Sequence, residues 1–493
     1  MSGSNSVQTI TFNEIPYAFL VPGTYVEMRP NYTNAGVFDW PARVLIVAQM
    51  LSSGTATPGV PYQLLSEGQA IALFGAGSQA QEMAWAFLEA NPYTRVDIIG
   101  VADAAAGGAA TGTITLGGAV TAAGTLNLYL AGRYVPVAVG ATDTLATIQT
   151  NTIAAINAVV KLPLVASAGA GTSITLTAKH KGTIGNGLNL RTNYRRGDAL
   201  PPGLTVAIIA MSGGLTDPSL SGVISAISST WYTDIALPFD DTLMAAELDR
   251  RYGAMVGLDA HAYVGVSGTY AALVTAATGF NSRFRTRIPV TNAPNSPWVW
   301  AASLCGVQAF QSSNDPARQT RGLVLPGLLA PADIDAFYAV EREILLTLGY
   351  STWNSMADGT VVIERVVTEN KTDTLGVATT AWQDIMAPKV YSRIRYDWRV
   401  FVTLQYPNNK LADDGSLAAE ADDTVVTPSR MKGSWAGRSR LYEQKGWIEE
   451  SAATAQASIF VRDGTDRNRL NARQEVRRIG NLMVLAGALE FQV

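Results

Sequence analysis

The stretch Arg43-Val-Leu-Ile-Val-Ala48 decides the fold class of this chain. It is a short apolar run rich in β-branched residues, which is typical of a strand buried in a sheet. A second such run, residues 95–100, follows two predicted helices at residues 66–74 and 79–89. Strands that alternate with helices predict a parallel or mixed sheet with helices on its faces.

The same alternation returns after Pro218 and continues to about Gln311. Three more strands are predicted there, each after a helix, at residues 232–237, 262–266 and 286–290. The fold class we expect is a multidomain α+β and α/β protein. Its mixed sheet of about five strands has flanking helices, an inserted β-rich module and extended terminal arms.

A change of composition separates the two parts of this sheet. From Ala104 to about Gly214 the chain is rich in Gly, Ala and Thr. Three segments there alternate apolar and polar residues beside glycine turns, at residues 113–116, 125–128 and 173–176. We therefore expect a separate β-rich module that interrupts the α/β domain.

These observations predict five parts. The expected divisions are an N-terminal arm (1–30), a discontinuous α/β domain (31–103 and 215–327), the inserted β-rich module (104–214), a C-terminal α+β domain (328–480) and a C-terminal strand or arm (481–493).

The two ends of the chain both carry apolar residues in segments that look extended. Near the C-terminus Leu489, Phe491 and Val493 alternate with polar residues, which predicts a strand with one apolar face. The N-terminal segment is broken by two prolines, and its apolar candidates are Ile10, Phe12, Tyr17 and Phe19. A terminal strand must pair its backbone groups, either within its own domain or on the sheet of a neighbour.

Composition excludes several classes of protein. Apolar residues make up 47% of the 493 residues and charged residues only 15%, so we expect other copies to cover much of the surface. A net charge of −4 gives no support for direct nucleic-acid binding. The sequence shows neither a signal peptide nor an apolar run of about 18 residues, so we expect cytoplasmic synthesis without membrane insertion. A single cysteine excludes an internal disulfide framework.

Two motifs that could carry chemistry have simpler interpretations. The segment Gly75-Ala-Gly-Ser-Gln-Ala80 matches a dinucleotide-binding pattern, but a helix precedes it rather than a strand, which favours a helix–helix turn. Asp240 and Asp241 follow a predicted strand, and an N-cap for the next helix is favoured over a metal site.

The histidines and the cysteine point to no active site either. His180 is expected in a basic turn and His261 at the start of a strand, without a nucleophile motif near either. Cys305 is expected to pack inside an apolar helix. We therefore predict no catalytic, cofactor-binding or metal-binding residues.

Charged residues before the C-terminal strand leave two interpretations open. Arg473, Arg477 and Arg478 either form a solvated face or pair with acids of a neighbouring copy, with Asp422 and Asp423 as candidates. Exposed pairs contribute only about 0–1 kcal/mol each, so such pairs would set register more than strength.

Several segments, taken in their order, resemble the contractile tail sheath proteins of Mu-like bacteriophages. They are Pro22-Gly-Thr-Tyr-Val-Glu27, Arg43-Val-Leu-Ile-Val47, Leu73-Phe-Gly-Ala-Gly-Ser78, Asn91-Pro92 followed by Val96-Asp-Ile-Ile99, and Lys179-His-Lys-Gly-Thr-Ile-Gly-Asn186. The resemblance extends over essentially the whole chain.

The resemblance implies a structural virion protein without enzymatic activity or cofactors. Its subunits would form hexameric rings stacked around a tail tube, with arms that exchange strands, the insert outside and the C-terminal domain toward the tube. Contraction would drive the tube through the host envelope. The implied partners are other copies, the tail tube protein, and baseplate and tail terminator proteins. The implied location is the virion tail, with assembly in the host cytoplasm.

Other interpretations remain open at this point. One is the sheath of a phage-derived bacteriocin or secretion machine. Another is an α/β enzyme with an inserted lid, for which Asp240 and Asp241 are the candidate polar cluster. A third is a surface or adhesin protein, which the lack of a signal peptide disfavours.

Overall fold

The computed structural model describes residues 14–16, 20–28 and 36–491. The chain divides into two compact units. We call the first the sheet unit, which consists of Trp40–Arg393 and Gly480–Val493. The second is the helical unit, which consists of Met1–Asp39 and Ile394–Ile479.

A six-stranded sheet forms the centre of the sheet unit, in the order β13-β12-β11-β1-β3-β2. Its strands are β1 (Val44–Met50), β2 (Pro61–Leu64), β3 (Val96–Ala102), β11 (Asp234–Ala236), β12 (His261–Ser267) and β13 (Arg285–Val290). All neighbours pair in parallel except β2, which is antiparallel to β3. Every residue of β1 is buried, as its run of apolar residues predicts. The five expected strands are present, and β2 adds a sixth at the edge of the sheet.

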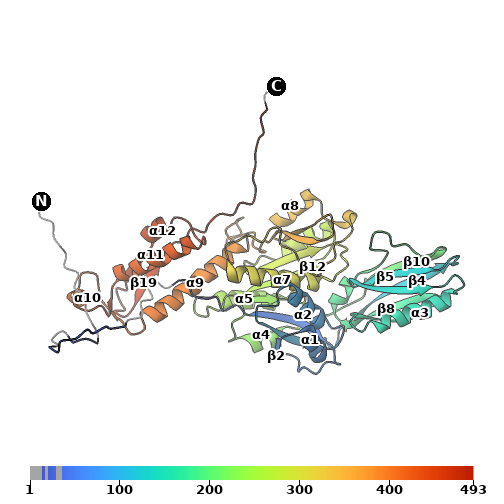
Figure 1. Ribbon diagram of the computed structural model, residues 1–493, viewed down its shortest axis with the longest axis horizontal. Coiled ribbons are helices and arrows are strands. Elements are labelled where there is room, and N and C mark those ends of the chain that lie inside the picture. The colour runs from blue at the N-terminus through green and yellow to red at the C-terminus, as the bar shows by residue number, and fades with distance from the viewer. Residues whose placement is uncertain (1–13, 17–19, 29–35, 492–493) are drawn as a thin grey trace. The chain divides into compact units, whose positions relative to one another are not determined.

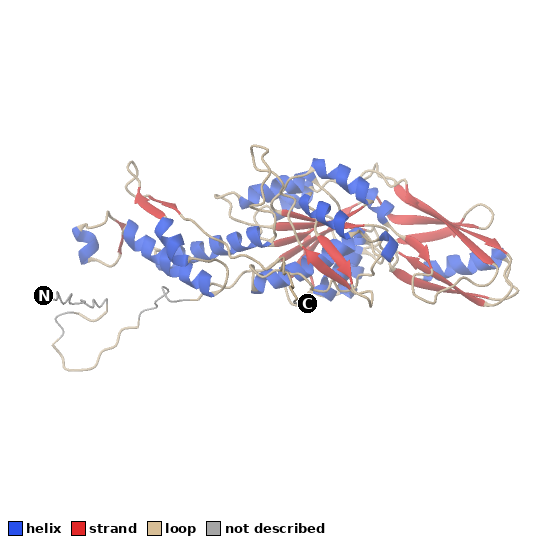
Figure 2. Cartoon of the chain, turned by 90° about the horizontal axis from the view of Figure 1, so that it is seen from above, coloured by secondary structure: helices blue, strands red, loops and turns tan. Residues whose placement is uncertain are grey.

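Helices cover both faces of this sheet (Figures 1 and 2). They are α1 (Glu67–Phe74), α2 (Gln79–Ala90), α4 (Ser221–Ile227), α5 (Thr242–Tyr252), α6 (Tyr270–Ala276) and α7 (Pro297–Asn314). Across the sheet, the chain runs from β1 to β3 toward one edge, and later from β11 through β12 to β13 toward the other edge. Because crossover connections are right-handed, this reversal places α2 and α5 on opposite faces. It also creates a topological switch point at the carboxyl ends of β1, β3 and β11.

The insert is β-rich, as the composition predicts. One of its sheets has the order β10-β4-β8-β7 and the other β6-β5-β9. The elements are β4 (Ala109–Gly118), β5 (Gly124–Leu130), β6 (Arg133–Val139), α3 (Leu145–Ala158), β7 (Leu164–Ala168), β8 (Ser173–Lys181), β9 (Leu190–Thr192) and β10 (Leu204–Ser212). The two connections to the sheet pair with each other, because Gly108 and Leu215 exchange backbone hydrogen bonds of 3.0 and 3.2 Å.

The last part of the sheet unit contains α8 (Ala339–Thr347), β14 (Thr352–Ser355) and β15 (Val361–Arg365). The amphipathic pattern of residues 332–348 predicts one longer helix. Instead, the helix begins only after Tyr338, whose backbone N–H donates to the Glu341 carboxylate over 2.9 Å. An isolated 3-10 turn, Asp333–Asp335, precedes it.

The helical unit contains α10 (Leu417–Ala421), α11 (Pro428–Gln444), α12 (Ser451–Ala457) and the second half of α9 (Met386–Gln405). Its short strands are β16 (Lys410–Leu411), β17 (Val425–Val426), β18 (Ile459–Arg462) and β19 (Leu470–Arg473). The sequence of residues 427–444 predicts a helix, which α11 confirms. The alternation of residues 455–462 predicts a strand, which is wrong at its start, because α12 continues to Ala457.

A buried charge holds the helical unit together. The Asp397 carboxylate accepts hydrogen bonds from the Phe38 N–H (2.8 Å), the Tyr442 hydroxyl (2.6 Å) and the Arg438 guanidinium, and the side chains of Asp397 and Arg438 are fully buried. Burial raises the pKa of Tyr442 well above its usual value, and the neighbouring Asp397 carboxylate raises it further. Since a buried charge is costly unless it is fully paired, these contacts fix residues 36–38 on α9 and α11.

Candidate assembly surfaces

The C-terminal tail, residues 480–491, has neither helix nor strand. Its start is anchored to the sheet unit: the Leu482 carbonyl accepts from Gln319 Nε2 (2.9 Å), the Met483 carbonyl accepts from an Arg321 guanidinium N–H (3.2 Å), and Met483 packs on the core. Beyond this anchor the side chains of Leu485, Leu489 and Phe491 are 85%, 93% and 81% exposed.

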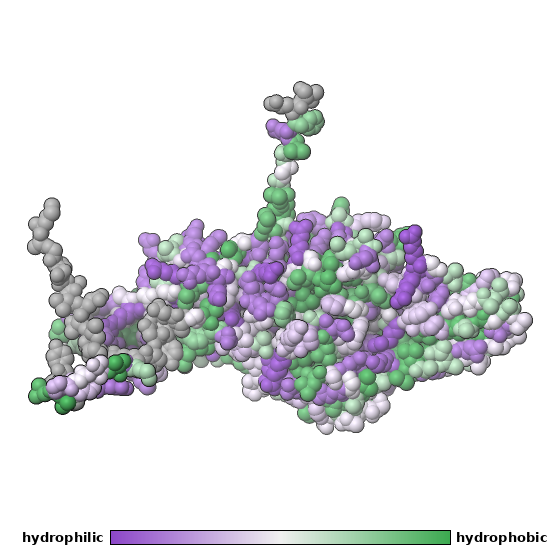
Figure 3. Space-filling view, viewed as in Figure 1, coloured by the Kyte–Doolittle hydropathy of each residue, from purple (hydrophilic) through white to green (hydrophobic). Residues whose placement is uncertain are grey.

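Figure 3 shows much of the tail in the hydrophobic colour. The residues have the alternation of a strand, yet none of residues 480–491 is paired as a strand. Of the two possibilities that the sequence left open, folding back into a sheet of its own subunit is therefore not observed for Leu489 and Phe491. The third candidate of this segment, Val493, lies outside the described residues.

The N-terminal candidates Ile10, Phe12, Tyr17 and Phe19 also lie outside the described residues. The described segment beside them is apolar and open to solvent. Its largely exposed side chains are Leu20, Val26 and Met28.

The hairpin β18–β19 in the helical unit is a candidate acceptor for a strand. Its two strands pair from Ile459↔Arg473 to Arg462↔Leu470, and within the described chain neither pairs with a third strand. Phe460 is buried toward the unit, whereas Ile459 and Val461 are each about half exposed. Two-stranded sheets are only marginally stable in water, and their open edges are sites for strand addition.

The turn of this hairpin is well ordered by hydrogen bonds. The backbone N–H groups of Asp466 and Thr465 donate to the Asp463 carboxylate over 3.0 and 2.9 Å, and the Thr465 hydroxyl adds a third bond. These donors lower the pKa of Asp463. Because the turn fixes the register of the hairpin, its outer edges are presented in one geometry.

The charged candidates all have partners within the chain. Arg473 lies 3.8 Å from Glu475, Arg477 pairs with Glu450, and Arg478 donates to the Ile479 carbonyl over 3.4 Å. Asp423 lies 3.7 Å from Arg430. Asp422 has several donors: its carboxylate accepts from the Thr424 hydroxyl and backbone N–H, and from Lys410 Nζ at 3.1 Å. These donors lower the pKa of Asp422 to about 2. These pairs are exposed and therefore weak enough to exchange, so pairing with a neighbouring copy stays a prediction.

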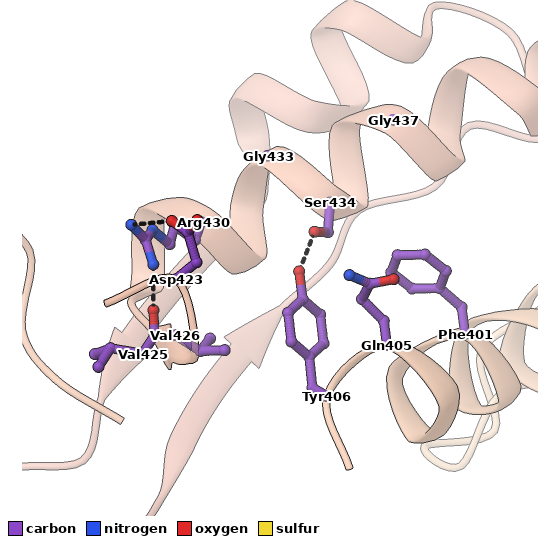
Figure 4. A pocket seen from close by; sticks show the side chains of 10 residues that line it. All are labelled: Phe401, Gln405, Tyr406, Asp423, Val425, Val426, Arg430, Gly433, Ser434 and Gly437. Carbon is purple, nitrogen blue, oxygen red and sulfur yellow. Dashed lines mark hydrogen bonds and ion pairs between the residues drawn. The ribbon is translucent and has the colours of Figure 1, made fainter. Parts of the chain in front are cut away.

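A cavity of about 510 Å³ opens between the end of α9 and α11 in the helical unit (Figure 4). Its residues are Phe401, Gln405, Tyr406, Asp423, Val425, Val426, Arg430, Gly433, Ser434 and Gly437. The hydroxyl groups of Tyr406 and Ser434 bond to each other, whereas Gln405 Oε1 has no partner. Both glycines face open space. The cavity therefore has room for a bulky side chain beside an acceptor.

The residues weighed for chemistry have structural roles. The Asp241 carboxylate accepts from the Met244 N–H over 2.8 Å and caps α5, as predicted. The segment from Gly75 to Ala80 joins α1 to α2, which confirms the helix–helix turn. Cys305 is fully buried in α7, and burial raises the pKa of its thiol well above the usual range.

Asp240 belongs to a charge network rather than to a metal site. It pairs with Arg285 (2.7 Å) and Arg287 (2.6 Å), and both arginines also bind the fully buried Glu369. Burial raises the pKa of Glu369, against the opposing effect of the two arginines. Across residues 14–16, 20–28 and 36–491 no cluster of three or more acidic, histidine or cysteine side chains is arranged to hold a metal. Among those same residues, none of the helices combines the length and apolar character that crossing a bilayer requires.

Among the residues weighed for chemistry, His180 has a different place from the one expected. It lies at the end of β8, only 3% exposed, and not in a turn. Its ring bonds to Asp103, which follows β3, and to Gln79 at the start of α2. The His180 ring and its partners lie at the carboxyl-end edge of the sheet, where an α/β sheet ordinarily accepts a ligand. Sequence reasoning missed this contact because 77 and 101 residues separate the partners.

Comparison with known proteins gives one strong similarity. Over 487 residues the chain is 30% identical to the Mu-like prophage FluMu tail sheath protein of Haemophilus influenzae, which covers 98% of this chain and 99% of the relative. No protein-family model matches.

One solved structure shows a similar fold at low identity, and a second is reported beside it. The chain superposes on the PVC sheath of an extracellular contractile injection system in its contracted state, with a TM-score of 0.51, 10% identity, and coverage of 96% of this chain and 98% of that one. A sheath tail protein from Listeria innocua gives a TM-score of 0.48 at 12% identity, with 89% and 92% covered.

Proposed function

The chain belongs to the family of Mu-like prophage tail sheath proteins, and from this premise we propose that its C-terminal tail links subunits by adding a strand to the β18–β19 hairpin of another copy. The protein is a tail sheath subunit of a phage-like contractile system. The observation that carries the proposal is the tail itself, whose side chains at Leu489 and Phe491 are almost fully exposed in a strand-like pattern.

Charge favours the hairpin as the acceptor. Six arginines and three acidic residues lie between Ile459 and Ile479, so this region is net positive. The described tail carries a single charge, that of Glu490. An acidic strand that approaches a basic edge is attracted to it, and like charges directly opposite would oppose pairing.

The energetics fit a linkage that forms only in an assembly. Burying a Leu or Phe side chain contributes roughly 1.5–3 kcal/mol. Ordering a strand costs about 1–2 kcal/mol per residue, so one donated strand is close to break-even before its hydrogen bonds are counted. Many such links in one lattice become strong through multivalency. A weak single link and a strong lattice are what a subunit needs if it stays unassembled in solution and polymerises on a template.

We place the remaining features of the assembly in the same proposal. The subunits form hexameric rings stacked around a tail tube, with the insert outside, the C-terminal domain toward the tube, and the N-terminal arm as a second linker. Baseplate, tube and terminator proteins are the partners. Subunits assemble in the host cytoplasm and act in the virion tail. The sheath of a phage-derived bacteriocin or secretion machine would have the same chemistry.

The enzyme interpretation has less support. Asp103, an acid at the edge of the sheet where an α/β enzyme would bind its substrate, is paired with His180. Asp240 and Asp241, the candidate polar cluster, are occupied by two arginines and a helix cap.

Truncation after Leu485 tests the proposal, because it removes Leu489 and Phe491 and keeps the anchor at Leu482 and Met483. We expect a soluble subunit with an unchanged circular dichroism spectrum that forms no tubes in negative-stain electron microscopy. Tubes of normal length from this truncation would overturn the role of the tail.

A further inference from the structure

The insert leaves one long strand edge open. Strand β10 lies at the end of the sheet β10-β4-β8-β7 and pairs on one side only, with β4 (Figure 1). On its other side, the stretch from Thr205 to Ala210 makes no backbone hydrogen bond with any residue that the structure describes. A row of unpaired N–H and C=O groups along an edge is a template for a further strand.

The other edges of the insert are each protected. Helix α3 packs beside β7, where the Asn157 side chain bonds both the N–H and the carbonyl of Ala166 over 2.9 Å, as a neighbouring strand would. Edge strand β6 contains Pro136, which has no N–H to donate. Edge strand β9 has only three residues and carries Arg191. Covered edges, prolines, short strands and charged side chains are all features that prevent strand addition.

Strand β10 has none of these features. Its sequence, Leu-Thr-Val-Ala-Ile-Ile-Ala-Met-Ser, contains no proline and no charge, and the nearest charged residues along the chain are Asp198 and Asp217. Val206 and Ile208 pack on the core, whereas the side chain of Ile209 is 65% exposed. The strand therefore presents open backbone groups together with β-branched side chains, a combination that favours pairing.

We propose that β10 is a dimerisation edge: in the free subunit it pairs antiparallel with β10 of a second copy, so that the two insert sheets become continuous. The choice of partner follows from the other edges and from charge. In a second copy β6 and β7 are protected as they are in the first. An uncharged strand also meets no like charge when it pairs with itself. The inference goes beyond the linkage by the tail and does not depend on it.

The symmetry of this pair separates it from the contacts of a sheath. Two copies of one strand that pair antiparallel are related by a twofold axis, so the same surface serves both subunits. Subunits stacked in rings around a tube, as proposed above, all point in one direction and have no such axis between them. The β10 pair is therefore a state of the subunit before assembly, and it must separate before both subunits enter one tube.

Light scattering coupled to size-exclusion chromatography tests the proposal on the full-length chain, in the soluble fraction that remains after tubes are removed by sedimentation. A single strand pair is a small interface, so we expect a dimer that dissociates with a Kd of roughly 1–100 µM. Ile209→Lys puts a charge in place of an apolar group on both edges and should weaken the dimer about tenfold or more. Val165→Lys is the matched control, because Val165 is 44% exposed on β7, whose edge Asn157 covers. The control should dimerise as the wild type does.

Hydrogen–deuterium exchange gives a second measurement. When the wild type is diluted through its Kd, the outward amides of β10 should exchange about tenfold faster, whereas the amides of β4, inside the sheet in both states, should not change. Truncation after Leu485 should leave the dimer intact. A dimer that disappears with the tail would identify the tail as the occupant of the β10 edge and overturn the proposal. A wild type that stays monomeric well above this range of Kd, or an Ile209→Lys variant that dimerises normally, would also overturn it.

Discussion

The sharpest prediction concerns the pair Leu489→Ala and Phe491→Ala in the tail. Both side chains are almost fully exposed in the isolated subunit, at 93% and 81%, so their removal should leave the free energy of unfolding within about 0.5 kcal/mol of the wild type. If both side chains become buried on the hairpin of another copy, the double variant loses about 3–5 kcal/mol of binding free energy per tail. This loss corresponds to a decrease of roughly a hundred- to several thousand-fold in the affinity of one tail for one hairpin.

The assay compares unfolding of the subunit with its assembly. Urea unfolding measures the first quantity, and sedimentation with electron microscopy measures the concentration at which tubes appear. Met255→Ala is the matched control, because Met255 is 98% exposed and lies outside the tail. We expect tubes from the control and none from the double variant at wild-type concentration. A double variant that assembles normally, or one that loses subunit stability, would refute the reasoning.

Three further predictions concern the folded subunit. Burial raises the pKa of Glu82 from 4.5 to about 7, so its contribution to the free energy of unfolding is full below about pH 4.5 and is lost as the pH rises through about 7. The variant Glu82→Gln should therefore be more stable than the wild type by about 3 kcal/mol at pH 8 and should differ little from it near pH 4. Urea unfolding at each pH measures this difference. Arg438→Met leaves Asp397 buried without its cation and should cost about 3–5 kcal/mol, seen as earlier unfolding by tryptophan fluorescence, and a loss below 1 kcal/mol would contradict the pairing. Asp241→Ala removes a helix cap and should cost about 1 kcal/mol in the same measurement, and no loss would remove the cap's role.

The central sheet could be predicted from the sequence because its signal is local. Residues 44–48 form an unbroken apolar run, and the later segments of the chain alternate strands with helices in the same way. Edge strand β2 escaped because Pro61 opens it and only one of its residues is buried. The start of the strand predicted at residues 455–462 failed for a similar reason, since Ala-rich residues there also favour a helix.

The features that could not be predicted from the sequence depend on contacts between residues far apart in the chain. His180 looks like a surface residue between two lysines, and nothing local indicates that Asp103 and Gln79 enclose it. The acceptor hairpin likewise has no signal of its own until β19 is seen to pair with β18. The tail was different, because the alternation of Leu489 and Phe491 with other residues is a local signal that the sequence alone shows.

Photocrosslinking from position 491 tests the central claim most directly. Subunits with Phe491→p-benzoylphenylalanine would be assembled with isotopically labelled wild-type subunits, irradiated as tubes and digested for mass spectrometry. The account predicts crosslinks from the unlabelled tail to labelled peptides within residues 459–473, which appear only in tubes. Crosslinks confined to the sheet unit of the same unlabelled chain, in tubes as in free subunits, would contradict it.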